Sequence, residues 1–259
     1  MRLAVVQTNP IFGDVQTNIK QALLLMENEH ADLYVLPELF NTGYNFIDAN
    51  EVNKLSEPVH GMTYKSISAF SKKKLCYVVY GFAEKSDRLY NSAAFVGPEG
   101  LIGVYRKVHL YYRETLFFAP GNLGFPVFDL PFGKVGMMVC FDWMYPESAR
   151  TLALKGAQLI AHPSNLVLPY CPDAMVTRCL ENRIFAATAN RVGRENRGGV
   201  DLTYIGKSEI VSPKGEILVR MDDKETGKTA VEVDLSVASN KRINEFNDLL
   251  AGRQASEYF

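Results

Sequence analysis

The residues of this chain that could do chemistry are one cysteine, one lysine and two glutamates, each close to an apolar run. Cys140 ends the run KVGMMVC and is followed at once by FDWMYPE and a predicted helix. A cysteine nucleophile needs a base to remove its proton and a positive charge to hold the thiolate. Glu38, at the end of LYVLPE, could be the base, and Lys107, in GVYRKVHLYYRE, could supply the charge. These residue types favour acyl transfer through a thiol, if the fold brings them together.

Each of these side chains also has an ordinary structural role when it is considered alone. A cysteine after an apolar run is more often an inert core residue than a nucleophile. Glu38 could lie at a solvated strand end, and Lys107 could be a surface lysine. Glu114, which follows Lys107 in the same block, could form an ion pair with Arg106 or Arg113. The catalytic interpretation therefore depends on the four positions being considered together.

The segments that must position these residues alternate between buried strands and helices. Strands are predicted at residues 3–8, 32–38, 76–84, 134–142, 157–165, 184–191 and 229–235, and helices at 19–26, 66–74, 146–155 and 173–183. Hairpins are predicted within 89–107 and 205–221, with turns at 97–100 and 212–215, and a polar helical tail follows the last strand. This pattern predicts an α/β protein whose mixed sheets are covered by helices. We expect a single domain over residues 1–259, because the sequence contains no linker or repeat.

Composition and charge disfavour several classes of protein. With 259 residues, 47% of them hydrophobic, the chain can bury a sizeable core without disulfides. A formal net charge of -1 gives no electrostatic footprint for nucleic acid or an anionic membrane. We expect no signal peptide and no membrane span, because no apolar stretch is long enough. The four scattered cysteines form no CxxC pair, which disfavours a zinc ribbon or a disulfide framework and favours a cytoplasmic protein with reduced thiols.

Three blocks in the sequence resemble the signature blocks of the nitrilase superfamily of carbon–nitrogen hydrolases. They are LPELFNTGY, YRKVHLYYRE and GMMVCFDWMYPE, in this order, and the similarity runs from LAVVQTNP to LSVASNKR. The resemblance implies a four-layer αββα sandwich, with two mixed β-sheets flanked by helices. It also implies that Glu38 is the general base, Lys107 the clamp for substrate and oxyanion, and Cys140 the nucleophile. Glu114 would be a second glutamate that orients Lys107 and the substrate amine.

The resemblance also implies an oligomer. Members of this superfamily usually form homodimers, or higher even homo-oligomers, through helices that extend the sandwich. The segments Ser148–Leu154 and Arg178–Arg183 are therefore interface candidates. The tail, about residues 240–259, is expected to reach across to the partner subunit.

The predicted reaction uses one carboxyl group as base and acid in turn. Glu38 takes the thiol proton, Cys140 attacks the carbon of an amide or nitrile, and Lys107 and the N–H of Phe141 stabilise the developing negative charge. Glu38 then protonates the leaving nitrogen, ammonia departs, and water releases the acid from the thioester. We therefore expect a raised pKa for Glu38, and the reaction requires no metal or organic cofactor.

The choice between amide and nitrile depends on the residues after the nucleophile. Amidase branches of the superfamily often carry an aromatic residue and Asp there, similar to Phe141-Asp142, whereas larger nitrilases carry Trp-Glu. This favours an amidase, with a nitrilase as the alternative, because some short nitrilases also resemble this chain around CFDW. A binding or scaffold protein that keeps the fold without turnover is the alternative of another class.

Further residues could line the substrate pocket or serve as an alternative base. The candidate substrate-binding residues are Tyr44, Phe141, Trp143 and Asn165, and Phe117 is a further aromatic candidate. Asp142 is expected to hold the turn after Cys140 through backbone hydrogen bonds. A papain-like site would use His109 or His162 as the base, which we disfavour because neither has an obvious orienting acid in the sequence.

Overall fold

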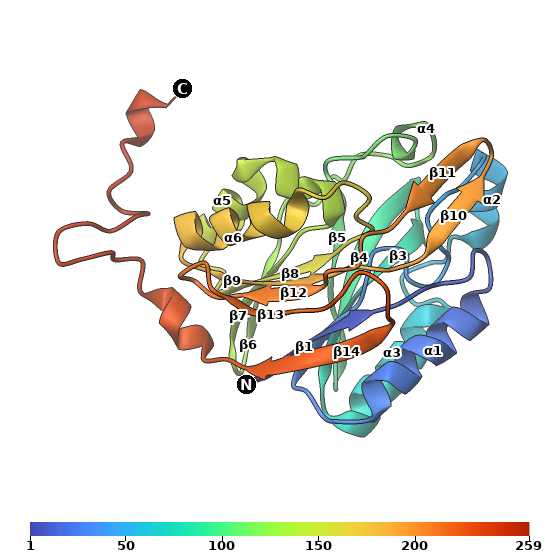
Figure 1. The fold of residues 1–259 in the computed structure, drawn as a ribbon, viewed down its shortest axis with the longest axis horizontal. Helices are drawn as coiled ribbons and strands as arrows, with labels where there is room; N and C mark the ends of the chain where they lie inside the picture. The colour runs from blue at the N-terminus through green and yellow to red at the C-terminus, as the bar shows by residue number, and fades with distance from the viewer. Residues whose placement is uncertain (259) are drawn as a thin grey trace.

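Two six-stranded mixed sheets pack face to face in the computed structural model, which describes residues 1–258 (Figure 1). The first sheet has the order β14-β1-β2-β3-β4-β5 and the second the order β13-β12-β9-β8-β7-β6. In each sheet three strands are parallel, β1-β2-β3 and β7-β8-β9, and antiparallel strands extend both edges. The first sheet comprises β1 (Arg2–Gln7), β2 (Leu33–Val35), β3 (Tyr77–Lys85), β4 (Leu89–Gly97), β5 (Gly100–Arg106) and β14 (Gly227–Glu232). The second comprises β6 (Val127–Leu130), β7 (Gly133–Met137), β8 (Leu159–Pro163), β9 (Phe185–Ala189), β12 (Glu209–Val211) and β13 (Ile217–Arg220).

Helices cover the outer face of each sheet. Helices α1 (Val15–Glu27) and α3 (Met62–Lys74) lie on the first sheet, and α5 (Pro146–Leu154) and α6 (Cys171–Asn182) lie on the second (Figure 1). Two short helices, α2 (Ala49–Leu55) and α4 (Glu114–Phe117), and the hairpin of β10 (Arg194–Arg197) and β11 (Val200–Thr203) lie near one end of the sandwich. The predicted four-layer αββα arrangement is therefore confirmed.

Successive side chains of the central strands point to opposite faces of the sheet and are apolar on both, which explains why both faces are covered. In β1, Leu3 and Val5 belong to the core between the sheets, whereas Ala4 and Val6 pack beneath α1 and α3. Side chains of a strand point to opposite faces in turn, so a strand with no polar alternation must be buried on both sides. The near-continuous apolar runs of the sequence correspond to these parallel strands.

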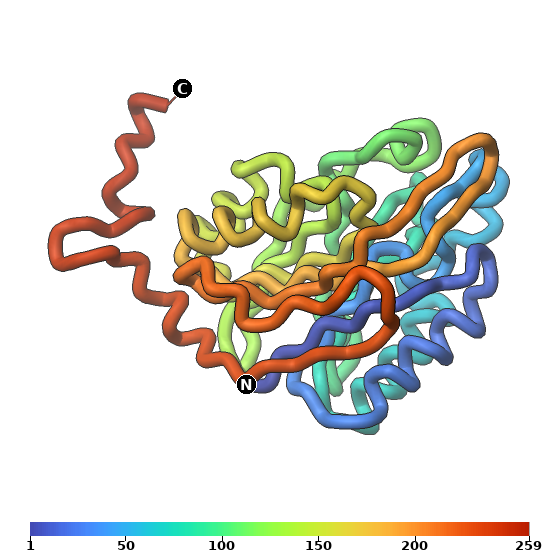
Figure 2. The backbone as a smooth tube through the Cα atoms, in the orientation of Figure 1, coloured from blue at the N-terminus to red at the C-terminus, as the bar shows by residue number. Residues whose placement is uncertain are grey.

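The chain differs from the sequence prediction in several places. The strand predicted over 134–142 ends at Met137, because Cys140–Met144 forms a short 3₁₀ helix, η1. Helix α2, strand β6 and the β10–β11 hairpin were not predicted. The predicted helical tail is also wrong: residues 241–258 form turns and one 3₁₀ turn, Ala255–Glu257, and extend away from the sandwich as an arm (Figure 2).

No helix within residues 1–258 is both long enough and apolar enough to cross a bilayer.

Candidate active site

Three of the four predicted chemical residues form one buried ion cluster. The Nζ atom of Lys107 lies 2.7 Å from Oε1 of Glu38 and 2.7 Å from Oε1 of Glu114. All three side chains are buried. Glu38 follows β2, Lys107 directly follows β5, and Glu114 begins α4, so three separate elements meet at one end of the sandwich. A buried ammonium group is tolerated when carboxylates compensate its charge, as Glu38 and Glu114 do for Lys107.

Neighbouring polar groups hold the ion cluster in position. Asn91, on β4, donates from Nδ2 to Oε1 of Glu38 at 2.7 Å, and its backbone carbonyl accepts from the N–H of Lys107. Asn165 donates to the backbone carbonyl of Glu38 at 2.8 Å, and the hydroxyl of Tyr44 donates to Glu114. Oε2 of Glu38 has no hydrogen-bond partner among residues 1–258, so one oxygen of this carboxyl group stays available.

A glycine on the neighbouring strand allows the backbone of Glu38 to take this position. A Cβ atom on Gly81 would come within 2.4 Å of the Cα atom of Glu38. Glycine is therefore required at this point of β3, because any side chain would displace the predicted base.

Cys140 lies at a strained turn between β7 and the helical segment that follows. Its φ angle is 44°, in the left-handed region that residues other than glycine rarely adopt. The backbone carbonyl of Cys140 accepts a hydrogen bond from Nε2 of His162 at 2.9 Å. Burial lowers the pKa of His162 to about 4, so this ring is neutral at pH 7, with Nδ1 accepting from the hydroxyl of Thr188. His162 therefore supports the turn and cannot easily act as a base.

The electrostatics of the site couple the protonation of Cys140 to the charge of Glu38. Burial raises the pKa of the Cys140 thiol well above its usual value, and the charge of Glu38 raises it further, while Lys107 opposes the shift. Burial also raises the pKa of Glu38 to about 7, against the lowering effect of Lys107. A thiolate next to an ionised Glu38 is therefore unfavourable, and the thiol loses its proton most easily when Glu38 receives it.

Lys107 keeps its charge in this buried position. Burial alone lowers the pKa of a lysine, but the carboxylates of Glu114 and Glu38 outweigh that effect and raise the pKa of Lys107. The cluster therefore holds a permanent ammonium group close to the thiol, where negative charge would develop during an attack.

Cys140 opens into a narrow cavity of about 20 Å³. The other residues that line it are Tyr111, Phe141, Trp143, Asn165, Leu166, Val167 and Leu168. Three of the four predicted substrate-binding residues thus face this space, but their roles toward a substrate stay predictions. Tyr44 does not line it; its hydroxyl group contacts Glu114, and with Phe117 it lines a neighbouring hollow. Tyr111 was missed, although it lies between Lys107 and Glu114 in the second sequence block.

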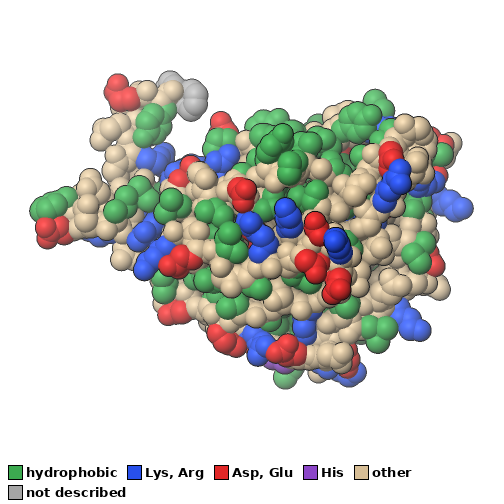
Figure 3. All heavy atoms as spheres, viewed as in Figure 1, with side chains coloured by type: hydrophobic (Ala, Val, Ile, Leu, Met, Phe, Trp, Pro, Cys, Tyr) green, Lys and Arg blue, Asp and Glu red, His purple; other side chains and the backbone are tan. Residues whose placement is uncertain are grey.

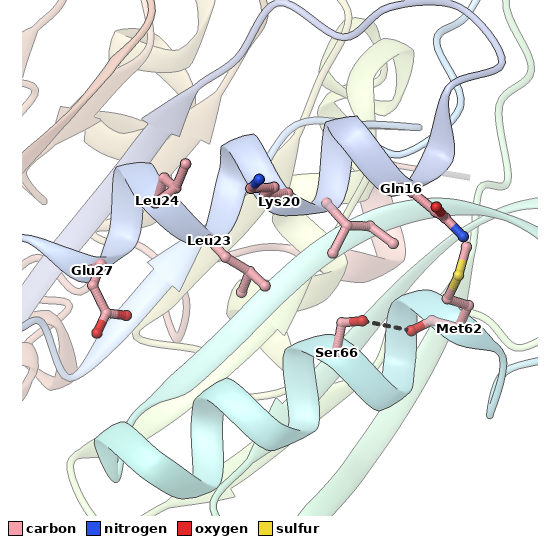
Figure 4. A pocket seen from close by; sticks show the side chains of 8 residues that line it. Gln16, Lys20, Leu23, Leu24, Glu27, Met62 and Ser66 are labelled. Atoms are coloured by element: carbon pink, nitrogen blue, oxygen red, sulfur yellow. Dashed lines mark hydrogen bonds between the residues drawn. The ribbon is translucent and has the colours of Figure 1, made fainter.

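A larger hollow lies elsewhere, on the outer helix layer. This open groove of about 410 Å³ runs between α1 and α3 (Figure 4). Its lining residues are Gln16, Ile19, Lys20, Leu23, Leu24, Glu27, Met62 and Ser66. This groove is larger than the cavity of Cys140, but the predicted nucleophile lines the smaller cavity.

Two buried carboxylates beside the site make contacts that the sequence analysis did not predict. His109 does have an orienting acid, because its Nδ1 lies 2.8 Å from Oδ1 of Asp142, so the expectation that it has none was wrong. Asp142 does hold the turn, as predicted, accepting from the N–H of Val139 at 2.8 Å. Glu195 was missed: it accepts from the N–H groups of Tyr44 and Asn45 and fixes the loop that carries Tyr44.

Potential metal ligands are not gathered in the described part of the chain. Residues 1–258 contain no group of three or more His, Cys, Asp or Glu side chains that could hold a metal ion.

Comparisons with known proteins identify the family to which this site belongs. Residues 2–242 match the family model for carbon–nitrogen hydrolases, and the chain belongs to this family. A nitrilase from Pyrococcus abyssi is 50% identical and aligns over 100% of this chain and 99% of its own length. The structure of a carbon–nitrogen hydrolase from Helicobacter pylori superimposes with a TM-score of 0.91 at 27% identity, covering 100% of this chain and 96% of that one.

A third comparison concerns the chemistry of the cysteine. A variant of an amidase from Nesterenkonia sp., with acrylamide added covalently at its active-site cysteine, superimposes with a TM-score of 0.81 at 25% identity, covering 99% and 97% of the two chains. The predicted membership of the nitrilase superfamily is confirmed. The protein is thus a carbon–nitrogen hydrolase, and a Glu-Lys-Cys triad is consistent with this family.

Replacement of Glu38 by glutamine tests its assignment as the base. Since Glu38 must be ionised to accept the thiol proton, kcat/KM of the wild type should fall as the pH drops below about 7. Glu38→Gln should lower kcat/KM by about 10²–10⁴-fold at every pH. Ammonia release measured from pH 5 to 9 checks both expectations, with the exposed Glu99→Gln as the matched control. A wild-type rate in Glu38→Gln would refute the assignment.

The same variant should change the dependence of stability on pH. The pKa of Glu38 in the folded protein, about 7, lies above its ordinary value of 4.5, so the native state binds the extra proton between these values. The free energy of unfolding of the wild type should therefore fall as the pH rises from 4.5 to 7, and Glu38→Gln should lack this part of the slope. Urea denaturation at pH 5 and pH 7.5 measures the difference.

Proposed function

We propose that this enzyme hydrolyses small uncharged amides to a carboxylic acid and ammonia through a thioester on Cys140. The observation that carries the proposal is the buried contact of Lys107 with both Glu38 and Glu114, beside a thiol whose pKa responds to all three charges. A cation, a base and a nucleophile held together in one desolvated site are what acyl transfer through a thiol requires.

The proposed first half-reaction forms the thioester. The free Oε2 of Glu38 takes the proton of Cys140 while the sulfur attacks the amide carbon, so no net charge enters the buried site. The ammonium group of Lys107 and the N–H of Phe141 stabilise the resulting oxyanion. Glu38 then gives its proton to the amide nitrogen, the C–N bond breaks, and ammonia leaves.

The second half-reaction returns the enzyme to its starting state. Glu38, ionised again, removes a proton from water, and the hydroxide attacks the thioester carbon. The C–S bond breaks, the carboxylic acid leaves, and Glu38 returns the proton to the sulfur of Cys140. One carboxyl group can serve both steps because its pKa of about 7 lies close to the working pH.

Glu114 favours an amide over a nitrile as the first candidate substrate. Its Oε2 accepts one hydrogen bond, from the N–H of Tyr111 at 3.3 Å, and so keeps acceptor capacity for a further donor. An amide offers two N–H donors to such an acceptor, whereas a nitrile nitrogen offers none. A nitrile is the second candidate, because the Pyrococcus abyssi relative that is 50% identical to this chain is named a nitrilase.

The cavity supports a substrate whose acyl group is small and uncharged. Around Cys140 the lining side chains are aromatic, aliphatic or amide groups: Tyr111, Phe141, Trp143, Asn165, Leu166, Val167 and Leu168. A carboxylate or ammonium group on the substrate would be desolvated there without an opposite charge, which is strongly unfavourable. The small volume of the cavity favours a small acyl group.

A matched substrate panel tests this proposal. Each amide is paired with the nitrile of the same acyl group, such as propionamide with propionitrile, and an ω-amide with a free carboxylate is the charged control. We expect ammonia release with a higher kcat/KM for the neutral amide than for the charged one. Faster release from the nitrile would establish the second candidate. No ammonia from any compound, and no covalent adduct on Cys140, would favour a binding or scaffold protein.

We also propose a homodimer, or a higher even homo-oligomer, built on a single domain over residues 1–259. Apolar side chains are exposed around the outer helices of the second sheet, as Figure 3 shows over α5 and α6; they include Met144, Tyr145, Leu154, Tyr170 and Leu180. The arm after Asn240 exposes Ile243 and Phe246, which suits a segment that packs on a partner subunit. Sedimentation velocity of the full chain tests this, and a monomer at micromolar concentration would contradict it.

Reduced thiols would suit a cytoplasmic location.

A further inference from the structure

Asp142 connects two parts of the active site that are distant in sequence. We propose that Asp142 is a positioning residue that fastens the strand end carrying Lys107 to the turn carrying Cys140, an inference that rests on the proposed roles of these two residues. Asp142 lies in η1, and its side chain is fully buried. It contacts neither the sulfur of Cys140 nor the ammonium group of Lys107 through any hydrogen bond within residues 1–258, so it would act through the backbone.

One oxygen of Asp142 joins the nucleophile turn to the end of β5. Oδ2 accepts from the N–H of Val139, which directly precedes Cys140, at 2.8 Å. The same oxygen accepts from the hydroxyl of Tyr105, two positions before Lys107, at 2.6 Å. The strained turn that carries Cys140 and the end of β5, directly before Lys107, are thus joined through a single atom.

The other oxygen of Asp142 holds the chain on the far side of Lys107. Oδ1 accepts from the backbone N–H of His109 at 3.1 Å and lies 2.8 Å from its Nδ1. The hydroxyl of Tyr105 also accepts from the N–H of Val108 at 3.1 Å. Residues before and after Lys107 are therefore both tied to Asp142, which sets the point from which the lysine side chain reaches the site.

The distance between Lys107 and Cys140 matters because the charge of the lysine stabilises the thiolate. The charged groups that act on the thiol are Glu38, Glu114 and Lys107, and of these Lys107 alone lowers its pKa. Misplacement of a catalytic group by about 1 Å can reduce a rate by about 10²-fold. A carboxylate that fixes both backbones would therefore influence the reactivity of a sulfur that it does not touch.

The arrangement requires a carboxylate, and an amide of the same shape cannot replace it. The backbone N–H groups of Val139 and His109 both point to Asp142, one to each oxygen. In Asp142→Asn the NH₂ group must face one of these two donors, whichever way the amide is turned. One of the two connections is then lost, although the volume of the side chain is unchanged.

The experiment compares Asp142→Asn and Tyr105→Phe with the wild type in the full-length enzyme. The pH dependence of Cys140 alkylation by iodoacetamide reports the thiol, peptide mass spectrometry assigns the modified cysteine, and ammonia release gives kcat. Tyr105→Phe removes only the hydroxyl on the lysine strand, so it remains informative if Asp142→Asn does not fold. The control is Tyr34→Phe, a buried tyrosine of the other core cluster whose hydroxyl bonds to backbone groups.

We expect kcat to fall by about 10- to 100-fold in Asp142→Asn, and by less in Tyr105→Phe. The alkylation profile of Cys140 should move to higher pH in both variants, because the stabilising charge of Lys107 is less well placed. Folded variants with a lower Tm but an unchanged alkylation profile and unchanged kcat would overturn the inference and leave Asp142 a purely structural residue. Alkylation needs no substrate, so a shifted profile in an enzyme that releases no ammonia would retain the inference and reject the proposed function.

Discussion

Replacement of Cys140 by alanine is expected to abolish hydrolysis, with a fall in kcat of about 10⁴-fold or more. The sulfur forms the covalent bond to the acyl group, so nothing in the variant can replace the thioester route. Removal of a catalytic nucleophile typically costs several orders of magnitude, since the other catalytic groups act only together with it. Ammonia release under saturating substrate is the measurement, and hydrolysis at the wild-type rate would eliminate the proposed mechanism.

Cys76 provides the matched control for this variant. It is also a buried free cysteine, but it lies in the core cluster under α1 and α3, away from the residues of the site. Burial raises its pKa to about 12, so it stays protonated and inert. Cys76→Ala should keep the wild-type kcat, with a small loss of stability of about 1–2 kcal/mol for the lost packing.

Replacement of Lys107 by methionine is expected to affect both activity and stability. Methionine fills a similar volume but leaves Glu38 and Glu114 in a buried site with no cation between them. Breaking a buried ion pair by removing one partner costs about 3–5 kcal/mol. Loss of the oxyanion clamp should lower kcat by about 10²–10³-fold, measured by ammonia release.

The loss of stability in Lys107→Met should depend on pH. Lys107 keeps its charge across the neutral range, so the dependence comes from the carboxyl groups. Without the lysine the pKa of Glu38 should rise further above its ordinary value of 4.5, and ionising this group becomes more costly as the pH increases. Urea denaturation should therefore show a larger gap from the wild type at pH 8 than at pH 5. A uniform loss, or one no larger than that of the exposed control Lys134→Met, would contradict this account.

The architecture could be predicted largely because the central strands are buried on both faces. Such strands give long apolar runs, as in residues 3–8 and 157–165, and runs of this kind separated by helices indicate parallel sheets between helix layers. The segments that were missed lack such a signal. Helix α2 is short and polar, with the sequence ANEVNKL, and the β10–β11 hairpin has the polar sequences RENR and VDLT. Their positions depend on tertiary contacts such as those of Arg197 with Glu51.

The end of β7 shows why an apolar pattern can mislead about a boundary. Residues 134–142 read as one buried strand, yet the strand ends at Met137 and the chain turns at Cys140 with a positive φ angle. Burial is continuous from Val135 to Cys140, across the end of the strand, so hydrophobicity alone does not mark the change. The turn depends on bonds from other elements, those of Asp142 and His162, which no local pattern reveals.

The residues of the candidate site could be predicted where the reaction requires a particular residue type. The residues that only hold these side chains in place through hydrogen bonds could not be predicted. Glu38, Lys107, Glu114 and Cys140 were predicted to meet at one site. Lys107 does contact both glutamates, whereas the sulfur of Cys140 forms no hydrogen bond to any of the three within residues 1–258. Asn91 and Glu195, which hold Glu38 and the loop of Tyr44, were missed. An asparagine inside a strand, or an acid in the polar segment RENR, has the same local sequence whether it supports a site or faces solvent.

The most direct test of the central claim is to trap the acyl group on the enzyme. The enzyme is mixed with a neutral amide that it turns over, quenched in acid within the first turnover, digested and analysed by peptide mass spectrometry. The account predicts an added acyl mass on the peptide that contains Cys140, which disappears on treatment with hydroxylamine as the corresponding hydroxamate forms. Hydrolysis that proceeds with no such adduct, or with the acyl group on another residue, would contradict it.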